Sequence, residues 1–116
     1  MDKEKDAPSE EELIEKAAEV VLGTEGVSSL SGTFSDAISR QLPMLGGGVK
    51  GVKLQEEASG LTFDIYVNVD YGVKIPQLAW DIQSAVKDAI EGISEKPISA
   101  VNIHVQGVQL PLARKG

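Results

Sequence analysis

The sequence predicts an α+β fold: a two-layer sandwich in the order helix, hairpin, helix, strand, with both helices on one face of a three-stranded sheet. Residues 9–22 and 75–93 repeat apolar residues at the spacing of amphipathic helices. Residues 61–71 and 101–105 alternate apolar and polar residues, which is typical of strands with one buried face. A chain of 116 residues, 41% of them hydrophobic, is sufficient for one domain with one small core.

The first helix is predicted to open at Ser9. Ser9 and Glu12 have the spacing of a capping box, in which each side chain bonds to the backbone N–H of the other residue. Two rows of apolar residues spaced by four make one stripe, and they comprise Leu13, Ala17, Val21, Ile14, Ala18 and Leu22. Gly23 is a typical helix end. The polar residues ahead of the helix, 1–8, are predicted to form a disordered acidic tail.

The segment between the first helix and the hairpin gives weaker signals. Residues 23–33 are predicted to be a loop. Residues 34–45 fit a short helix that Pro43 would end. Three successive glycines follow this segment, and whether residues 33–48 are ordered stays open.

A hairpin is predicted next. Residues 52–57 alternate in character, and residues 58–60, Ala-Ser-Gly, turn the chain. The alternation in residues 61–71 is strict, and the residues on its inner side are Leu61, Phe63, Ile65, Val67, Val69 and Tyr71.

The second helix is the clearest element of the sequence. Its apolar stripe comprises Ile75, Leu78, Ala79, Ile82, Ala85, Val86, Ala89, Ile90 and Ile93. Pro76 suits the first turn, where its missing N–H is not needed. Gly92 and Pro97 are expected to end the helix.

The last strand shows a change of parity: its apolar residues have odd numbers before Gly107 and even numbers after it. Residues 101–105 point alternate apolar side chains toward the core, but the apolar positions shift after Gly107, so we expect a β-bulge near Gly107. Residues 111–116 form a short tail, which leaves 9–110 as the folded domain. The strand order stays open. The uncovered face of the sheet is expected to be polar, and its residues include Lys53, Gln55, Asp64, Tyr66, Asn68, Asn102 and His104.

Charge and composition exclude several classes of protein. The net charge of −7 repels phosphate backbones, so no nucleic-acid partner is expected. No apolar run approaches the roughly 20 residues that cross a bilayer, so no direct membrane insertion is expected. The charged N-terminus lacks the apolar region of a secretory signal, which predicts a cytoplasmic protein. The absence of cysteine excludes disulfides, thiolate nucleophiles and cysteine-based zinc sites.

Several short strings follow one another in a specific order. They are Glu-Gly-Val at 25–27, Leu-Ser-Gly at 30–32, Gly-Val-Lys at 51–53, Tyr-Gly-Val-Lys-Ile-Pro at 71–76 and Val-Asn-Ile-His-Val-Gln-Gly-Val at 101–108, with Ala79, Ile82, Gln83, Val86 and Lys87 before the last. In this order and spacing, across residues 12–110, the chain resembles the bacterial alkaline shock protein family, also called envelope stress response or general stress proteins.

The resemblance implies a non-catalytic, cytoplasmic interaction or scaffold protein of the envelope stress response. Such a protein acts through protein–protein contacts near the membrane, where a membrane-anchored partner holds it, and a homo-oligomer is a further expectation. The resemblance brings no catalytic residue, no cofactor and no metal ligand. In one place the chain departs from the family: residues 6–10 are polar where family members often have a short apolar segment, so the contacts of that segment are not carried over.

The chain offers few residues for chemistry. His104 is the only histidine, and a zinc site needs three or four ligands, so we expect a surface residue, with pH sensing as a second interpretation. Asp64 and Asp70 share a strand face, but six residues of strand separate them by about 20 Å, too far for a pair of catalytic carboxylates. No enzyme activity is expected.

An alternative function comes from residues 48–51, which read Gly-Val-Lys-Gly. This string matches the G-x-x-G loop with which KH domains clamp nucleic-acid backbones. In KH domains the loop joins two helices, whereas here it leads into a strand. An RNA-binding module is therefore the alternative to an interaction protein.

Trp80 is the residue that most directly suggests an interaction. It lies about 150° from the middle of the apolar stripe at 100° per residue, beside Lys87 and Glu91. Tryptophan is enriched at the centres of protein interfaces. Trp80, Lys87 and Glu91 are therefore predicted to bind a protein partner or a second copy. Cover by residues 33–48 and plain exposure are the other interpretations of Trp80.

Overall fold

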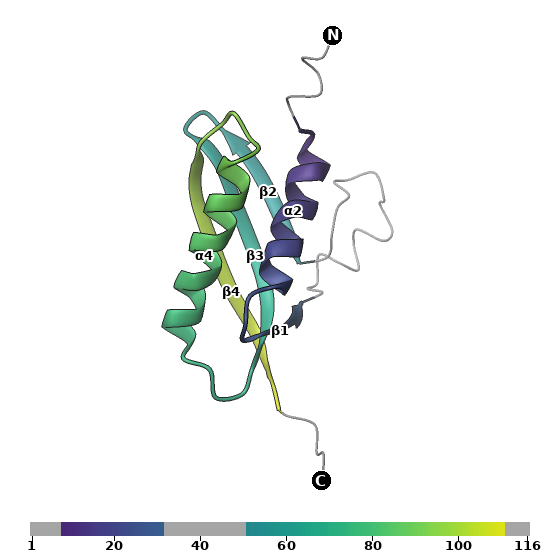
Figure 1. Cartoon of the computed structure of the whole chain (residues 1–116), viewed down its shortest axis with the longest axis vertical. Helices are drawn as coiled ribbons and strands as arrows, with labels where there is room; N and C mark the ends of the chain where they lie inside the picture. The colour runs from purple at the N-terminus through teal and green to yellow at the C-terminus, as the bar shows by residue number, and fades with distance from the viewer. Residues whose placement is uncertain (1–7, 32–50, 111–116) are drawn as a thin grey trace.

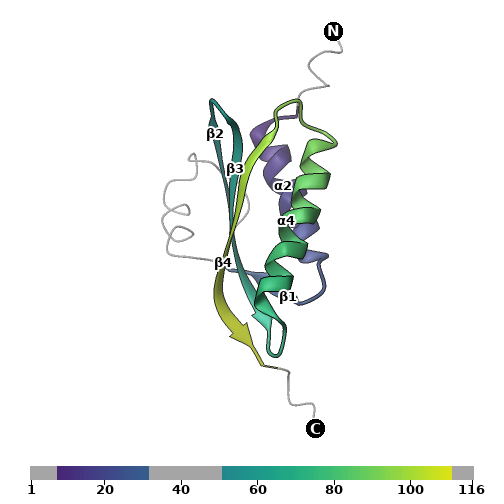
Figure 2. The ribbon, with the colours of Figure 1, turned by 90° about the vertical axis from the view of Figure 1, so that its left-hand side faces the viewer.

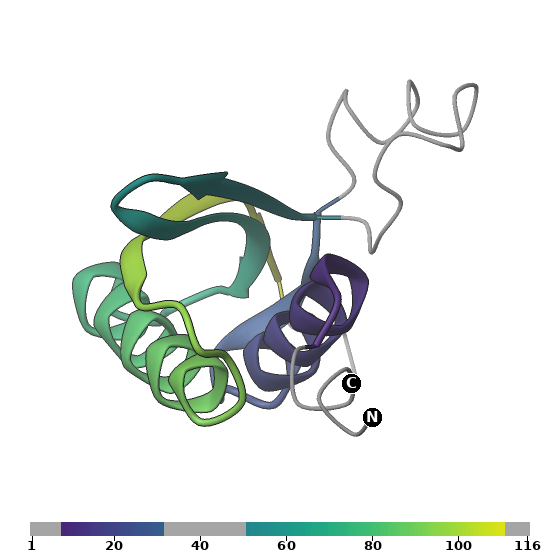
Figure 3. The same cartoon turned by 90° about the horizontal axis from the view of Figure 1, so that it is seen from above.

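The computed structural model describes residues 8–31 and 51–110, which form a mixed four-stranded sheet and two helices (Figure 1). The elements are α2 (Glu10–Leu22), β1 (Val27–Leu30), β2 (Val52–Glu57), β3 (Gly60–Asp70), α4 (Ile75–Glu91) and β4 (Ile98–Gln109). Both helices lie on the same face of the sheet, so the molecule has two layers (Figures 2 and 3). The predicted α+β two-layer architecture is confirmed.

Strand β3 is the centre of the sheet. β4 runs parallel to it from Leu61 to Asp70, and β1 and β2 both run antiparallel to it. A strand can pair along two edges. β4 occupies one edge of β3, so β1 and β2 share the other. They meet at Tyr66, whose N–H donates to the carbonyl of Gly51 at 2.7 Å and whose carbonyl accepts from the N–H of Ser31 at 2.8 Å. One edge of β3 is thus completed by two short strands.

Strand β1 corrects the prediction that residues 23–33 are a loop, and it gives the sheet a fourth strand where three were predicted. The strand pairs with β3 from Val69 to Val67, and the register shifts between Val27 and Ser29. Two adjacent serines and this irregularity hide the alternation by which a strand is recognised. Pairing with an available edge of β3 therefore decides the conformation where local propensity is weak.

Helix α2 has the predicted N-terminus. The Ser9 N–H donates to Glu12 Oε1 at 3.0 Å, and the Glu12 N–H donates to Ser9 Oγ at 3.1 Å, which completes the capping box. The inner side of α2 is buried, through Leu13, Ile14, Ala17, Ala18 and Val21. Leu22, predicted on the same stripe, is 51% exposed because it is the last residue of the helix.

The core lies between the inner face of the sheet, chiefly β3, and the apolar stripes of α2 and α4. Its most completely buried large side chains are Phe63, Leu61, Ile65, Ile82, Ile90, Val21, Val67, Val69 and Val86. Besides Leu22, three further residues predicted to be inside are exposed instead: Tyr71, Ile75 and Ile93. β3 ends at Asp70, before Tyr71, and the two isoleucines lie at or beyond the ends of α4. The predicted stripe and alternation therefore extend too far, because side chains at or beyond the ends of these elements are not buried.

The predicted hairpin and bulge are confirmed. β2 pairs with β3 from Val52 opposite Ile65 to Glu57 opposite Gly60. In β4 the register shifts as predicted, because Val67 pairs with Val105 and the next residue of β3 pairs with Gly107. One extra residue, Gln106, is accommodated there, which explains the change of parity.

Some predictions lie outside the described residues. They concern the acidic tail up to residue 7, the short helix at 34–45 with the glycines after it, and the tail at 111–116.

Candidate functional site

Trp80 lies on the outer side of α4 with 63% of its surface exposed. The opposite side of the helix packs into the core through Leu78, Ile82, Val86 and Ile90. An indole on the outer side adds nothing to that packing. A large exposed aromatic ring is the type of side chain that anchors protein interfaces.

Lys87 and Glu91 share this side of the helix with Trp80. Residues 7 and 11 positions apart return to the same helix face, and all three side chains are exposed. We call this surface the outer stripe, and it consists of Gln77, Trp80, Ser84, Lys87 and Glu91. The structure therefore brings the three predicted partner-binding residues onto one surface, and their binding of a partner stays a prediction.

The orientation of α4 is fixed by contacts on its other sides. Gln83 donates from Nε2 to the backbone carbonyl of Val101 on β4, at 3.0 Å. Figure 3 looks along the helices and shows α2 beside α4 in the same layer. These contacts hold the helix against rotation, so the outer stripe faces away from the sheet.

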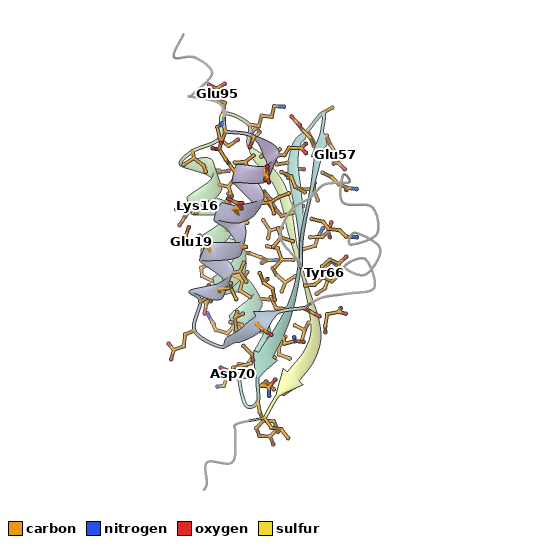
Figure 4. All side chains as sticks on the ribbon, turned by 90° about the vertical axis from the view of Figure 1, so that its right-hand side faces the viewer. Lys16, Glu19, Glu57, Tyr66, Asp70 and Glu95 are labelled. Atoms are coloured by element: carbon orange, nitrogen blue, oxygen red, sulfur yellow. The ribbon has the colours of Figure 1, made fainter. Side chains whose placement is uncertain are left out.

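A second group of side chains lies on the face of the sheet opposite to α2 and α4. We call it the polar cluster, and it consists of Lys53, Asp64, Tyr66, Asn102 and His104. The parallel register of β3 and β4 builds it, because Asp64 lies opposite Asn102 and Tyr66 lies opposite His104. Figure 4 shows Tyr66 projecting from the sheet on the side away from the helices.

Hydrogen bonds and stacking join the members of the polar cluster. Asp64 Oδ1 lies 3.1 Å from Asn102 Nδ2, which donates to it, and 3.0 Å from His104 Nε2. The rings of Tyr66 and His104 stack with centroids 4.4 Å apart and 13° between their planes. Lys53 Nζ lies 5.8 Å from the centre of the Tyr66 ring, at the distance of a cation–π contact. Asp64 and His104, both expected on the polar face of the sheet, are thus in direct contact.

The polar cluster has limited means for catalysis. An ionised Asp64 accepts a hydrogen bond from a protonated Nε2, which leaves Nδ1 as the second nitrogen of His104. In the described part of the chain, the side chain that hydrogen-bonds to His104 is the carboxylate of Asp64. A histidine that acts as a general base would instead bond to a nucleophile, such as a hydroxyl, and activate it. The described residues also hold no group of three His, Cys, Asp or Glu side chains arranged for a metal ion. The cluster is better suited to shaping a polar surface.

The RNA-binding alternative depended on residues 48–51. Residues 48–50 lie outside the described residues, and Gly51 stands directly before β2 with a φ of +88°. A side chain at Gly51 would meet the Leu30 side chain at 3.0 Å, so glycine serves the close approach of β1 and β2. This packing explains Gly51 without nucleic acid.

Neither of the two described helices has both the length and the apolar character needed to cross a membrane.

Sequence relatives and solved structures resemble this chain. Uncharacterized protein Spy1535 of Streptococcus pyogenes serotype M6 is 55% identical over 60 residues, which are 51% of this chain and 46% of that protein. The match therefore spans about half the length of that relative. Uncharacterized protein YqhY of Bacillus subtilis (strain 168) is 29% identical over 103 residues, which are 84% of this chain and 76% of that protein.

The fold recurs in a solved point variant of MamM-CTD. The TM-score is 0.50 at 15% sequence identity, and the match covers 85% of this chain and 98% of that one. At this identity the likeness shows the fold alone.

The family match covers nearly the whole chain. Residues 3–110 match the alkaline shock protein 23 family, which is described as having a cell envelope-related function. This agrees with the resemblance found in the short strings and their spacing. The chain belongs to the alkaline shock protein family.

Proposed function

We propose that this chain is a non-catalytic interaction protein of the envelope stress response, which works in the cytoplasm by binding protein partners near the membrane. The observation that carries the proposal is Trp80, exposed on the outer stripe of a helix whose other side is fully packed. The cell envelope-related description of the family supports the cellular setting.

The composition of the outer stripe supports protein binding. An interface commonly combines a buried aromatic anchor with a polar rim. Trp80 supplies the ring, and Lys87 and Glu91 supply charges of both signs beside it. A partner of this kind, anchored in the membrane, would hold the domain near the envelope.

The polar cluster supports a role without catalysis. Its carboxylate already accepts from two donors, and its imidazole is stacked against Tyr66. No buried side-chain polar atom in the described part of the chain lacks a hydrogen-bond partner. Groups that satisfy one another in this way need no substrate to complete them.

The experiment is a pull-down from the source cells, read by mass spectrometry, with wild type, Trp80→Ala and a matched control. Leu22→Ala is that control, because Leu22 is also large, apolar and exposed, but lies on α2. We expect Trp80→Ala to lower partner recovery at least tenfold, which corresponds to about 1.4 kcal/mol. Leu22→Ala should leave recovery unchanged, and both variants should keep the wild-type melting temperature. Equal recovery by wild type and Trp80→Ala would show that the interface lies elsewhere.

A further inference from the structure

The charges of α4 are arranged against its own dipole. The N-terminus of a helix is its positive end and the C-terminus its negative end. Lys74 is the N-cap of α4, the first turn contains no acidic residue, and Lys74 makes no side-chain capping bond. The last turn contains no basic residue, but it holds Asp88 and Glu91. Each of these charges lies at the end of the helix that disfavours it.

The rest of the described chain does not compensate this arrangement. None of Lys74, Asp88 and Glu91 forms a salt bridge with any other residue of the described part of the chain. Helix α2 shows the opposite arrangement, with three glutamates and a capping box at its positive end. Within residues 8–31 and 51–110, the folding of one copy therefore does not explain the charge pattern of α4.

We infer that a second copy of this chain binds the outer stripe, with its own α4 antiparallel to the first. This inference rests on the proposed function, because it uses the same surface and names the partner. A two-fold axis passing between Gln83 and Ser84 would relate positions at equal distances on either side of it. Trp80 of each copy then lies against Lys87 of the other. Tryptophan is the aromatic ring that binds a lysine ammonium most strongly.

The same two-fold axis brings the opposed charges together. At 1.5 Å per residue, Lys74 lies about 14 Å and Glu91 about 11 Å from that axis, on opposite sides. The acidic end of one α4 therefore lies at about the same level along the helix axis as the lysine and the positive helix end of the other. Charges that are unfavourable within one helix become complementary between two. A parallel arrangement would instead place like charges together, so the charge pattern favours the antiparallel one.

The test measures self-association by analytical ultracentrifugation from about 1 μM to about 1 mM, a range that detects weak dimers. Lys74→Glu and Glu91→Lys are the two informative variants. Each alone places like charges across the two-fold axis and should weaken the dimer at least tenfold. An equimolar mixture restores opposite charges in both contacts, because one copy then carries two acids and the other two lysines at these positions. The mixture should therefore dimerise about as tightly as wild type.

Two further variants make the result specific. Lys16→Glu on α2 is the matched control, since the Lys16 side chain is partly exposed and its ion pair lies within its own helix, and it should leave the dissociation constant unchanged. Trp80→Ala should weaken the dimer at least tenfold. Lys74→Glu and Glu91→Lys each place the charge that the helix end favours, so the melting temperature of the dilute single copy should not fall.

Two outcomes would overturn the inference: a wild-type chain that stays monomeric over the whole range, or a mixture no tighter than its components. In another outcome, the wild type stays monomeric in ultracentrifugation and yet recovers a protein other than itself in the pull-down, one that the Trp80→Ala variant no longer recovers. In that case the proposed function stands and the second copy is excluded as the partner. If Trp80→Ala changes neither readout, the inference and the proposed function both fail.

Discussion

The imidazole of His104 stacks on the ring of Tyr66, with centroids 4.4 Å apart, across the junction of β3 and β4. The two residues lie 38 positions apart in the sequence and face each other because the two strands are parallel and in register at this point. Asp64 holds the imidazole from the same strand that carries Tyr66. The stacked pair thus links the central strand β3 to β4 on the face of the sheet opposite to α2 and α4.

We expect the Tyr66 and His104 rings to stabilise the fold jointly. In a double-mutant cycle of Tyr66→Ala and His104→Ala, read by urea unfolding, the coupling energy should be about 0.5–1.5 kcal/mol, as for other stacked aromatic pairs. Gln55 and His104 provide the control cycle, because Gln55 pairs with Thr62, about 13 Å along β3 from Tyr66, and their effects should simply add. Additive effects for Tyr66 and His104 as well would mean that the stacking contributes nothing.

Ile82 tests the packing of α4 on the sheet. Its side chain is fully buried at the middle of the helix, so Ile82→Ala should lower the free energy of unfolding by about 2–5 kcal/mol. Ile93→Ala removes the same atoms from a residue that is 40% exposed beyond the end of α4, and it should cost less than half as much. Similar losses for the two variants in urea unfolding would contradict the described packing.

The sequence predicted the elements with strong periodicity and missed those that depend on tertiary pairing. The apolar stripe of α4 and the alternation of β3 are long, so one atypical residue does not obscure either pattern. The stripe correctly placed Ile82 in the core, and the alternation correctly placed Phe63 there. Strand β1 is short and contains two serines, so nothing local distinguishes it from a loop. Its conformation is decided by the edge of β3 with which it pairs.

The two candidate surfaces, the outer stripe and the polar cluster, could be predicted from the sequence to different extents. The exposure of Trp80 follows from the phase of one helix, which the sequence alone contains. The polar cluster depends on which residue of β4 lies beside which residue of β3, and alternation gives the face of a residue but not its register. Tyr66 and His104 were therefore predicted on the same face, but their stacking required the structure.

A comparison of Gly60 with Gly72 distinguishes the cost of backbone strain from the cost of a steric clash. Both have a positive φ, +139° and +93°, which L-residues rarely adopt. A Cβ at Gly60 would lie 2.5 Å from the Pro97 carbonyl oxygen, whereas a Cβ at Gly72 would have no atom within 4 Å. Gly72→Ala should therefore cost only the strain of the left-handed conformation, about 1–2 kcal/mol.

Gly60→Ala should cost clearly more than Gly72→Ala, because it adds a clash with backbone to that strain. The backbone at Pro97 cannot retreat freely, since its carbonyl accepts the N–H of Leu61 at 2.9 Å and thereby joins the start of β3 to the chain entering β4. Guanidinium unfolding of the two variants measures the difference. The two slopes against denaturant should match, so that the comparison concerns stability and not a change of the unfolded state. Equal losses would mean that the hairpin end and the segment before β4 are not in contact in solution.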